Sequence, residues 1–193
     1  MRIEIRSDSV LLDGYVNAVD RYSRPISSPT GRFIERIVPG TFKKALERAE
    51  NVDLLLDHNK ERKLGSIKEG NLQLFEDNIG LRAICTVKDK EVIEKARKNQ
   101  LRGWSFGFFS NKDTWEGEKG ELQKRSVSDI DLTEVSIIDS NMTPIYIGTS
   151  IEKRGSQEVT KETRQEDFRA VIEDTTKKEV DKDYYKNLRE RIK

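Results

Sequence analysis

The sequence is poor in the two residue types that most often carry metal and redox chemistry. Among its 193 residues there is one cysteine, Cys85, and one histidine, His58. A single thiol cannot form a disulfide within the chain, and it excludes every structural zinc site that needs two thiolates. Any imidazole chemistry must therefore use His58.

Long apolar runs and a charge excess of one sign are also missing. No segment approaches the roughly 18 apolar residues of a membrane-spanning helix, and the first ten residues lack the apolar centre of a signal peptide. With 36 Lys and Arg against 35 Asp and Glu, the net charge is +1, so no overall field attracts nucleic acid or an anionic membrane. We expect a soluble, cytosolic protein with neither of these partners.

Charged residues are abundant instead, at 37% of the chain against 34% hydrophobic residues. Residues 151–193 hold 12 Lys and Arg and 11 Asp and Glu in 43 positions. Such a segment buries too little apolar surface to offset its own ordering entropy. We expect a folded domain over residues 1–150 and a charged C-terminal tail over 151–193, disordered or partly helical. Two short stripes in the tail have helical spacing: Val180, Tyr184, Leu188 and Ile192, and Phe168, Val171 and Ile172.

The first 150 residues alternate short apolar runs with turn signals. Two helices are predicted, one capped by Thr41 with an apolar face at Phe42, Ala45, Leu46 and Ala49, and one over Glu91–Asn99, capped by Asp89, with Val92, Ile93 and Ala96 inward. Many strands with two helices favour an antiparallel barrel or sandwich with helical covers over a doubly wound sheet. The predicted strands are Val10–Val19, Arg32–Val38, Val52–Asp57, Leu64–Ile67, Asn71–Phe75, Leu81–Val87, Trp104–Phe109, Leu122–Ile130 and Leu132–Ile138.

His58 follows an apolar run that ends in the polar cluster Asp57-His58-Asn59. An imidazole where a strand leaves the core can exchange a proton near neutral pH. A structural hydrogen bond without a catalytic role is the alternative. A metal site using Asp53 and Asp57 has little support, because in an extended strand both lie on the face opposite His58. We expect neither a metal nor a cofactor.

Ser105 lies in the stretch Gly103-Trp104-Ser105-Phe106-Gly107-Phe108. In an extended strand the three aromatic residues point to one face and should fill the core. Ser105 then lies between two glycines on the other face, where a substrate carbonyl could approach its hydroxyl. The alternative is that the glycines make room for a covering helix.

Glu134 alternates with Val135 and Ile137 in a predicted interior strand. A carboxylate there needs a hydrogen-bonding partner. That partner could be a protonated His58, or an arginine such as Arg125 in a structural ion pair. Ser105, His58 and Glu134 are together the residue types of a hydrolytic triad, in which a base activates the hydroxyl and an acid orients the base. Their separation in the sequence says nothing about distance, so the grouping is a hypothesis.

The ordered set of motifs resembles the tailed-phage prohead, or capsid maturation, proteases, whose fold is similar to that of the herpesvirus assemblin proteases. The resemblance spans about residues 10–148. It implies a closed antiparallel β-barrel with flanking helices and a serine endopeptidase with Ser105 as nucleophile, His58 as general base and Glu134 as third member. The matching stretches are Gly31–Phe42, Leu55–Asn59 with Leu64–Ser66, Gly80–Leu81, Gly103–Phe108 and Leu132–Ile138.

Two departures from the family pattern stand out. Thr41 replaces a common alanine, and Ser140–Pro144 replaces a Pro-Ala pair. The second departure affects the loop in which the herpesvirus relatives place their oxyanion donor. The oxyanion hole is therefore unassigned, with the backbone N–H groups of Asn141 and Met142 as candidates.

The resemblance also implies substrates and a location. Such an enzyme cleaves scaffold, or the scaffold-like extension of the major capsid protein, inside the procapsid in the host cytoplasm, and often cleaves itself. It implies a homo-oligomer and a tail used for delivery or self-cleavage. Two alternatives remain: a non-catalytic capsid-assembly or scaffolding protein that binds capsid subunits through its tail, and an unrelated β-domain in which His58 and its aspartates are structural.

Overall fold

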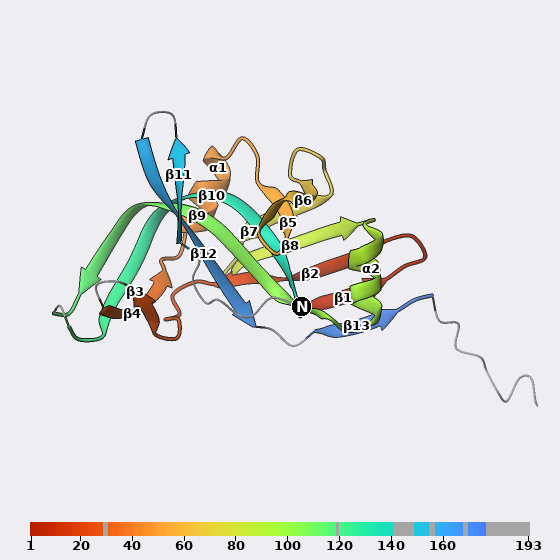
Figure 1. The fold of residues 1–193 in the computed structure, drawn as a ribbon, viewed down its shortest axis with the longest axis horizontal. Helices are drawn as coiled ribbons and strands as arrows, with labels where there is room; N and C mark the ends of the chain where they lie inside the picture. The colour runs from red at the N-terminus through yellow and green to blue at the C-terminus, as the bar shows by residue number, and fades with distance from the viewer. Residues whose placement is uncertain (29–30, 119, 141–148, 155–156, 168–169, 177–193) are drawn as a thin grey trace, which may run out of the picture.

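The computed structural model describes residues 1–28, 31–118, 120–140, 149–154, 157–167 and 170–176 (Figure 1). Within these ranges the chain forms two helices, α1 (Thr41–Arg48) and α2 (Lys90–Arg97), and a larger number of strands. The strands are β1 (Arg2–Ile5), β2 (Val10–Ala18), β3 (Ile26–Ser28), β4 (Gly31–Ile37), β5 (Asp53–Leu56), β6 (Asn59–Ser66), β7 (Leu72–Glu76), β8 (Gly80–Val87), β9 (Leu101–Glu116), β10 (Gln123–Asp139), β11 (Thr149–Arg154), β12 (Gln157–Asp167) and β13 (Val171–Asp174).

The strands are arranged in two sheets. The first has the order β13-β1-β2-β8-β7, and the second has the order β11-β12-β9-β10-β4-β3, with β5 paired to β10 and β6 paired to β5. The two sheets share no hydrogen-bonded strand in the part of the chain that the structure describes, and neither closes on itself. The expected closed barrel is therefore not found. The sheets are also mixed rather than antiparallel throughout, because β10 runs parallel to β4 and β5, and β1 runs parallel to β13.

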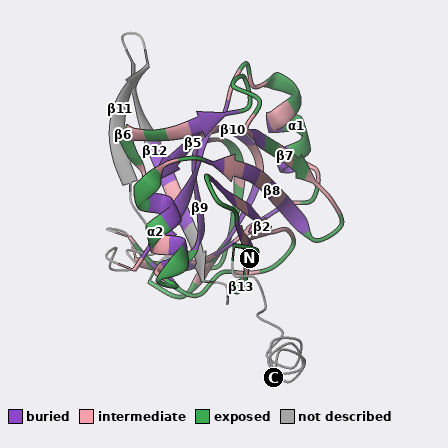
Figure 2. Cartoon of the chain, turned by 90° about the vertical axis from the view of Figure 1, so that its right-hand side faces the viewer, coloured by how far each residue is buried: buried purple, intermediate pink, exposed green. Residues whose placement is uncertain are grey.

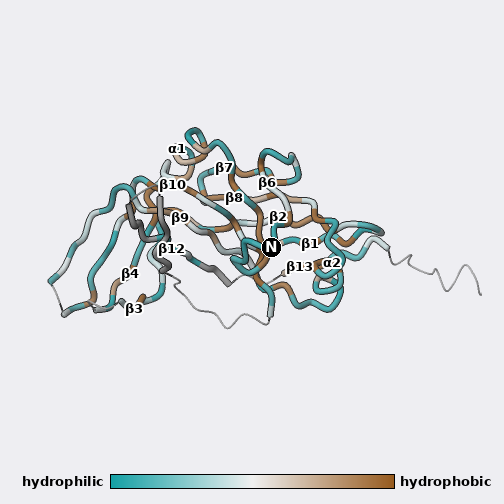
Figure 3. Tube along the Cα trace, turned by 45° about the horizontal axis from the view of Figure 1, so that its top comes forward, coloured by the Kyte–Doolittle hydropathy of each residue, from teal (hydrophilic) through white to brown (hydrophobic). Residues whose placement is uncertain are grey.

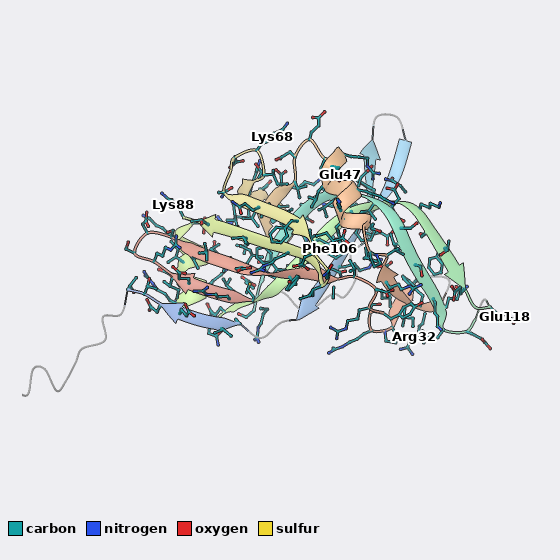
Figure 4. All side chains as sticks on the ribbon, turned by 180° about the vertical axis from the view of Figure 1, so that it is seen from behind. Arg32, Glu47, Lys68, Lys88, Phe106 and Glu118 are labelled. Carbon is teal, nitrogen blue, oxygen red and sulfur yellow. The ribbon has the colours of Figure 1, made fainter. Side chains whose placement is uncertain are left out.

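The two longest strands, β9 and β10, cross the middle of the molecule and bend over much of its length (Figure 1). Their buried parts, with those of β2 and β8, form the interior in Figure 2, and the same segments are the apolar ones in Figure 3. Trp104, Phe106 and Phe108 are fully buried, as predicted. Phe106 lies at the centre of the fold (Figure 4), stacked on Phe108 at 5.3 Å between ring centroids and edge-on to Phe42 of α1 at 5.4 Å.

Both predicted helices form, but one begins differently from the prediction. Asp89 caps α2, as expected, by accepting a hydrogen bond from the backbone N–H of Val92 at 3.0 Å. Thr41 is instead the first residue of α1, and Gly40 takes the cap position with a left-handed φ of 85°. The Glu76 carboxylate from β7 satisfies the open helix end, because it accepts hydrogen bonds from the N–H groups of Gly40 and Lys43. No helix among the described residues is long and apolar enough to cross a membrane.

The described part of residues 151–176 forms strands where a disordered or partly helical tail was expected. Val171 and Ile172 lie in β13, which extends the first sheet beside β1. The helical prediction for this stripe is therefore wrong, because backbone pairing with β1 overrides a weak local pattern. β12 pairs with β9 in the second sheet. Phe168 and the stripe from Val180 to Ile192 lie outside the described residues, and the domain boundary at residue 150 stays a prediction.

Candidate active site

His58 lies in the two-residue turn that joins β5 to β6. Asp57 and His58 both have positive φ angles, 53° and 58°, which is the backbone of a type I′ hairpin turn. Asp and His are among the few residues besides glycine that adopt this conformation without a large penalty. Three hydrogen bonds tie the turn to β10. Asp57 accepts one from the N–H of Asp139 and donates one from its own N–H to the Ile137 carbonyl, and Ser136 Oγ accepts one from the N–H of His58. The imidazole is thereby held at a fixed place beside β10.

The structure brings the three predicted site residues together. His58 Nε2 lies 2.6 Å from Ser105 Oγ, and His58 Nδ1 lies 2.7 Å from Glu134 Oε1. Ser105 is fully buried, Glu134 is 2% exposed, and the side chain of His58 is 20% exposed. These residues come from β9, the β5–β6 turn and β10, so the contact depends on the pairing of β10 with both β9 and β5.

The Glu134 carboxylate is held in its ionised form. Burial alone would raise its pKa, but the hydrogen bond and electrostatic interaction with His58, the positive charge of Lys161 and a hydrogen bond from Ser136 lower the pKa overall. Lys161 Nζ lies 3.5 Å from Glu134 Oε1. Because an ionised carboxylate can only accept, His58 donates through Nδ1, and Nε2 is left to accept the Ser105 hydroxyl proton. This arrangement can activate an alcohol as a nucleophile.

Gly107 makes the space that this arrangement needs. It lies opposite Glu134 across the β9–β10 ladder. A Cβ atom at this position would overlap Glu134 Oε1 and would lie 2.6 Å from Lys161 Cε. The glycine therefore makes room for the Glu134 carboxylate and for the Lys161 side chain of β12, and not for a covering helix.

Ser105 was expected on an open face, and in this structure that expectation is wrong. β12 runs antiparallel beside β9 with Gln165 opposite Ser105, and the Ser105 hydroxyl is 2.6 Å from the backbone carbonyl oxygen of Arg164. Sequence reasoning missed this contact, because residues 157–167 contain a single apolar residue, Val159, and carry no strand periodicity. The strand is ordered by backbone pairing and by ion pairs.

A cluster of buried charges lies next to the site, where β4, β10 and β12 meet. Arg164 contacts Glu35 through Nε at 2.7 Å and Nη2 at 2.9 Å, and Arg125 contacts Glu162 at 2.6 and 2.9 Å. Arg125 also contacts Glu35 at 2.9 Å and Asp113 at 2.7 Å. Arg125 thus takes its partners from this cluster rather than from Glu134, where the basic neighbour is Lys161.

Burial would lower the pKa of the Arg164 guanidinium, but the charges and hydrogen bonds of Glu35 and Glu162 raise it overall. Burial would raise the pKa of Glu162, and hydrogen bonding to Arg125 with the charges of both arginines lowers it overall. All four charges of the Glu35, Arg125, Glu162 and Arg164 set are therefore compensated within the cluster.

The remaining candidates are placed as follows. Asp53 pairs with Lys63 at 2.9 Å and accepts a hydrogen bond from Asn51. Among the described residues no group of three His, Cys, Asp or Glu side chains could hold a metal ion. Asn141 and Met142, the candidates for the oxyanion hole, lie outside the described residues.

Comparisons with known proteins give one finding. No curated protein and no solved structure matches the chain. The family model described as caudovirus prohead serine protease matches residues 1–164, a range that contains Ser105, His58, Glu134 and the charge cluster. A match over this much of the sequence establishes that the chain belongs to the caudovirus prohead serine protease family.

Proposed function

We propose that this protein is a serine endopeptidase in which Ser105, His58 and Glu134 form the catalytic triad. The observation that carries the proposal is the continuous hydrogen-bonded relay from a buried carboxylate, through the one histidine of the chain, to a serine hydroxyl. Membership of a serine protease family supports it independently.

The geometry suits the steps of acyl transfer. Ser105 Oγ attacks the carbonyl carbon of the scissile bond while His58 Nε2 takes its proton. His58 then gives the proton to the leaving amine, and water hydrolyses the acyl-enzyme by the same sequence of transfers. Glu134 keeps the proton of neutral His58 on Nδ1 and stabilises the imidazolium that forms.

Glu134 suits the role of third member better than its two acidic neighbours. Asp139 pairs with Lys95 of α2 and accepts its hydrogen bond at 2.5 Å. Asp131, midway along β10, accepts hydrogen bonds from Arg48 and Asn111. Glu134 is the carboxylate with a hydrogen bond to the imidazole.

Family membership implies that the enzyme acts on capsid proteins within the procapsid of the host cell. The proposal adds that the substrates are scaffold or the scaffold-like extension of the major capsid protein, that the enzyme cleaves itself, and that it works as a homo-oligomer. The close approach of β12 to Ser105 supports self-cleavage.

A fluorophosphonate probe and a phage carrying Ser105→Ala test the proposal. We expect the probe to label Ser105 and the variant phage to retain its scaffold in immature capsids. Ser110→Ala is the matched control, since Ser110 lies on the same strand with its hydroxyl turned to Asp113. Normal capsid maturation by the Ser105→Ala phage would contradict the proposal and favour the non-catalytic assembly protein.

A further inference from the structure

β12 lies beside Ser105 in the way that an extended peptide lies beside an edge strand. It pairs antiparallel with β9 over Lys161–Asp167, with Thr163 opposite Gly107 and Gln165 opposite Ser105 (Figure 1). Strand addition of this kind is a general way of binding extended peptides, because the ladder gives affinity and side-chain pockets give specificity. In this chain the added strand is the protein's own.

The peptide bond after Arg164 is the one presented to the nucleophile. Ser105 Oγ lies 2.6 Å from the Arg164 carbonyl oxygen and 2.6 Å from His58 Nε2. The carbonyl carbon is one C=O bond from that oxygen, so it lies at most about 3.8 Å from Oγ. Attack begins at about 3–3.5 Å with the carbonyl carbon, rather than its oxygen, nearest the nucleophile, so a small rotation of this peptide group completes the approach. The Ser105 hydroxyl donates to the Arg164 carbonyl oxygen, which can only accept. Its single proton must therefore turn to His58 Nε2 before the serine oxygen can attack the carbonyl carbon.

The side chain of Arg164 fills a site that matches an arginine. It is 6% exposed, makes two hydrogen bonds to the Glu35 carboxylate, and lies over the ring of Phe108 at 5.3 Å. A planar guanidinium uses both features, since it pairs with a carboxylate through two N–H groups and stacks on an aromatic face. Lysine offers neither geometry in full.

Glu162, two residues before Arg164, lies in a second site, where the binding group is a cation instead of a carboxylate. Arg125 binds its carboxylate through two nitrogens, at 2.6 and 2.9 Å. Both sites keep a charged partner when β12 is absent, because Arg125 also pairs with Glu35 and Asp113. The groove can therefore empty and refill without leaving an isolated buried charge.

We infer that the edge of β9 is the substrate groove of the protease and that it selects extended peptides with arginine directly before the scissile bond, held by Glu35, and an acidic residue two positions earlier, held by Arg125. The Arg164–Gln165 bond of this chain is one such substrate. The inference rests on the proposed function and specifies its substrate.

The reaction balances with water alone. Ser105 Oγ forms a bond to the Arg164 carbonyl carbon, the bond from that carbon to the Gln165 nitrogen breaks, and the serine proton passes through His58 to the new amine of Gln165. Water then releases the Arg164 carboxylate and restores the serine hydroxyl. The products are residues 1–164 and residues 165–193.

Intact-mass spectrometry of the purified full chain over time tests the inference. We expect a Ser105-dependent product ending at Arg164 from the parent chain. Arg164→Ala should slow its formation about 100-fold or more, because a site built for hydrogen bonds rejects a residue that lacks them, and Glu162→Gln should slow it about 10-fold. Arg97→Ala, at an exposed position of α2, is the control and should cleave normally.

A double-variant cycle separates specificity from folding. The rate of cleavage after residue 164 should be about 100-fold higher in the parent chain than in the Arg164→Gln variant. In a Glu35→Gln background this ratio should fall to a few-fold, since the pocket no longer holds a carboxylate. A merely structural Glu35 would lower both rates and leave their ratio unchanged, which would overturn the inference. Fluorophosphonate labelling of Ser105 in each variant shows that its site is folded.

The other possible outcomes distinguish failure of this inference from failure of the proposed function. Ser105-dependent cleavage at other bonds only, undiminished cleavage of the Arg164→Ala chain, or labelled Ser105 in a chain that stays intact would overturn the inference and leave the proposed function in place. Loss of both labelling and every Ser105-dependent cleavage would overturn the proposed function itself.

Discussion

Both sheets of this protein bury apolar side chains, but the second sheet buries charged and hydroxyl groups as well. In the first sheet the inward positions of β1, β2 and β8 are apolar, and its ion pairs, such as Arg82 with Asp13, lie at the surface. Burial also raises the pKa of the Cys85 thiol in this sheet, which favours its un-ionised form. In the second sheet the region around β9, β10 and β12 buries the charged and hydroxyl side chains Glu35, Ser105, Arg125, Glu134, Ser136, Lys161, Glu162 and Arg164.

This difference separates the apolar side chains that stabilise the fold from the polar side chains that can act on a substrate. Apolar burial contributes about 25 cal/mol per Å² of surface removed from water. A buried ion pair gives back in attraction roughly what its charges lose in hydration, so it is weak evidence for stability. The buried polar groups of the second sheet are therefore explained best by chemistry and recognition. Substitutions of these groups and of apolar residues in the first sheet should have different consequences.

The largest effect is expected at His58. His58→Asn should lower turnover by about 10⁴-fold or more, because it removes the base, while asparagine tolerates the positive φ of the turn. Turnover of a peptide cleaved by the parent enzyme measures the effect. The contrast is Leu12→Ala in the first sheet, which should leave the turnover of folded molecules unchanged. Equal turnover losses in the two variants would remove the distinction between the regions.

Glu134→Gln should cost less than loss of the base, no more than about 10⁴-fold in turnover. The amide has nearly the same size, but it cannot hold the imidazolium by charge and it can favour the wrong tautomer of His58. The fluorophosphonate reaction rate at Ser105 measures this loss without a peptide substrate. A variant with parent activity would remove Glu134 from the triad.

Stability should respond to the buried charges when they are left without a partner. Arg125→Met removes the cation that Glu35, Glu162 and Asp113 share and should lower the free energy of unfolding by about 3 kcal/mol. Leu12→Ala should cost about 2–5 kcal/mol through its cavity. Denaturant unfolding compares the two. Combining Arg125→Met with Glu162→Gln should recover part of the loss, whereas no recovery would show that the two side chains are not coupled.

The smallest effect concerns pH. Glu134 and Glu162 have lowered pKa values in the folded chain, despite burial, because of His58 in one case and the two arginines in the other. Their contribution to the free energy of unfolding is present above the ordinary carboxyl pKa of about 4.3 and is lost as pH falls through the folded values. Glu162→Gln should flatten this acid limb in thermal unfolding between neutral and acid pH. An identical slope in parent and variant would contradict the assignment.

Much of the fold could be predicted from local patterns. The alternation around Phe106 identified the core face of β9, and Asp89 was recognised as a helix cap from its residue type and position. The predicted barrel was wrong because closure depends on which edge strands meet, and a strand's own residues do not specify this. The cap of α1 was missed for a similar reason, since it comes from Glu76 of another strand.

The sequence by itself determined which groups are available: one imidazole, a serine between glycines on an aromatic strand, and a carboxylate among apolar residues. Only the tertiary structure decided that they touch, because the contacts join positions 47 and 76 residues apart through the pairing of β10 with its neighbours. It also decided that a charged segment expected to be a tail lies against Ser105. That segment has no apolar periodicity from which a strand could be predicted. Its position is set by pairing with the edge of β9 that faces away from β10, and by charged residues on β4 and β10.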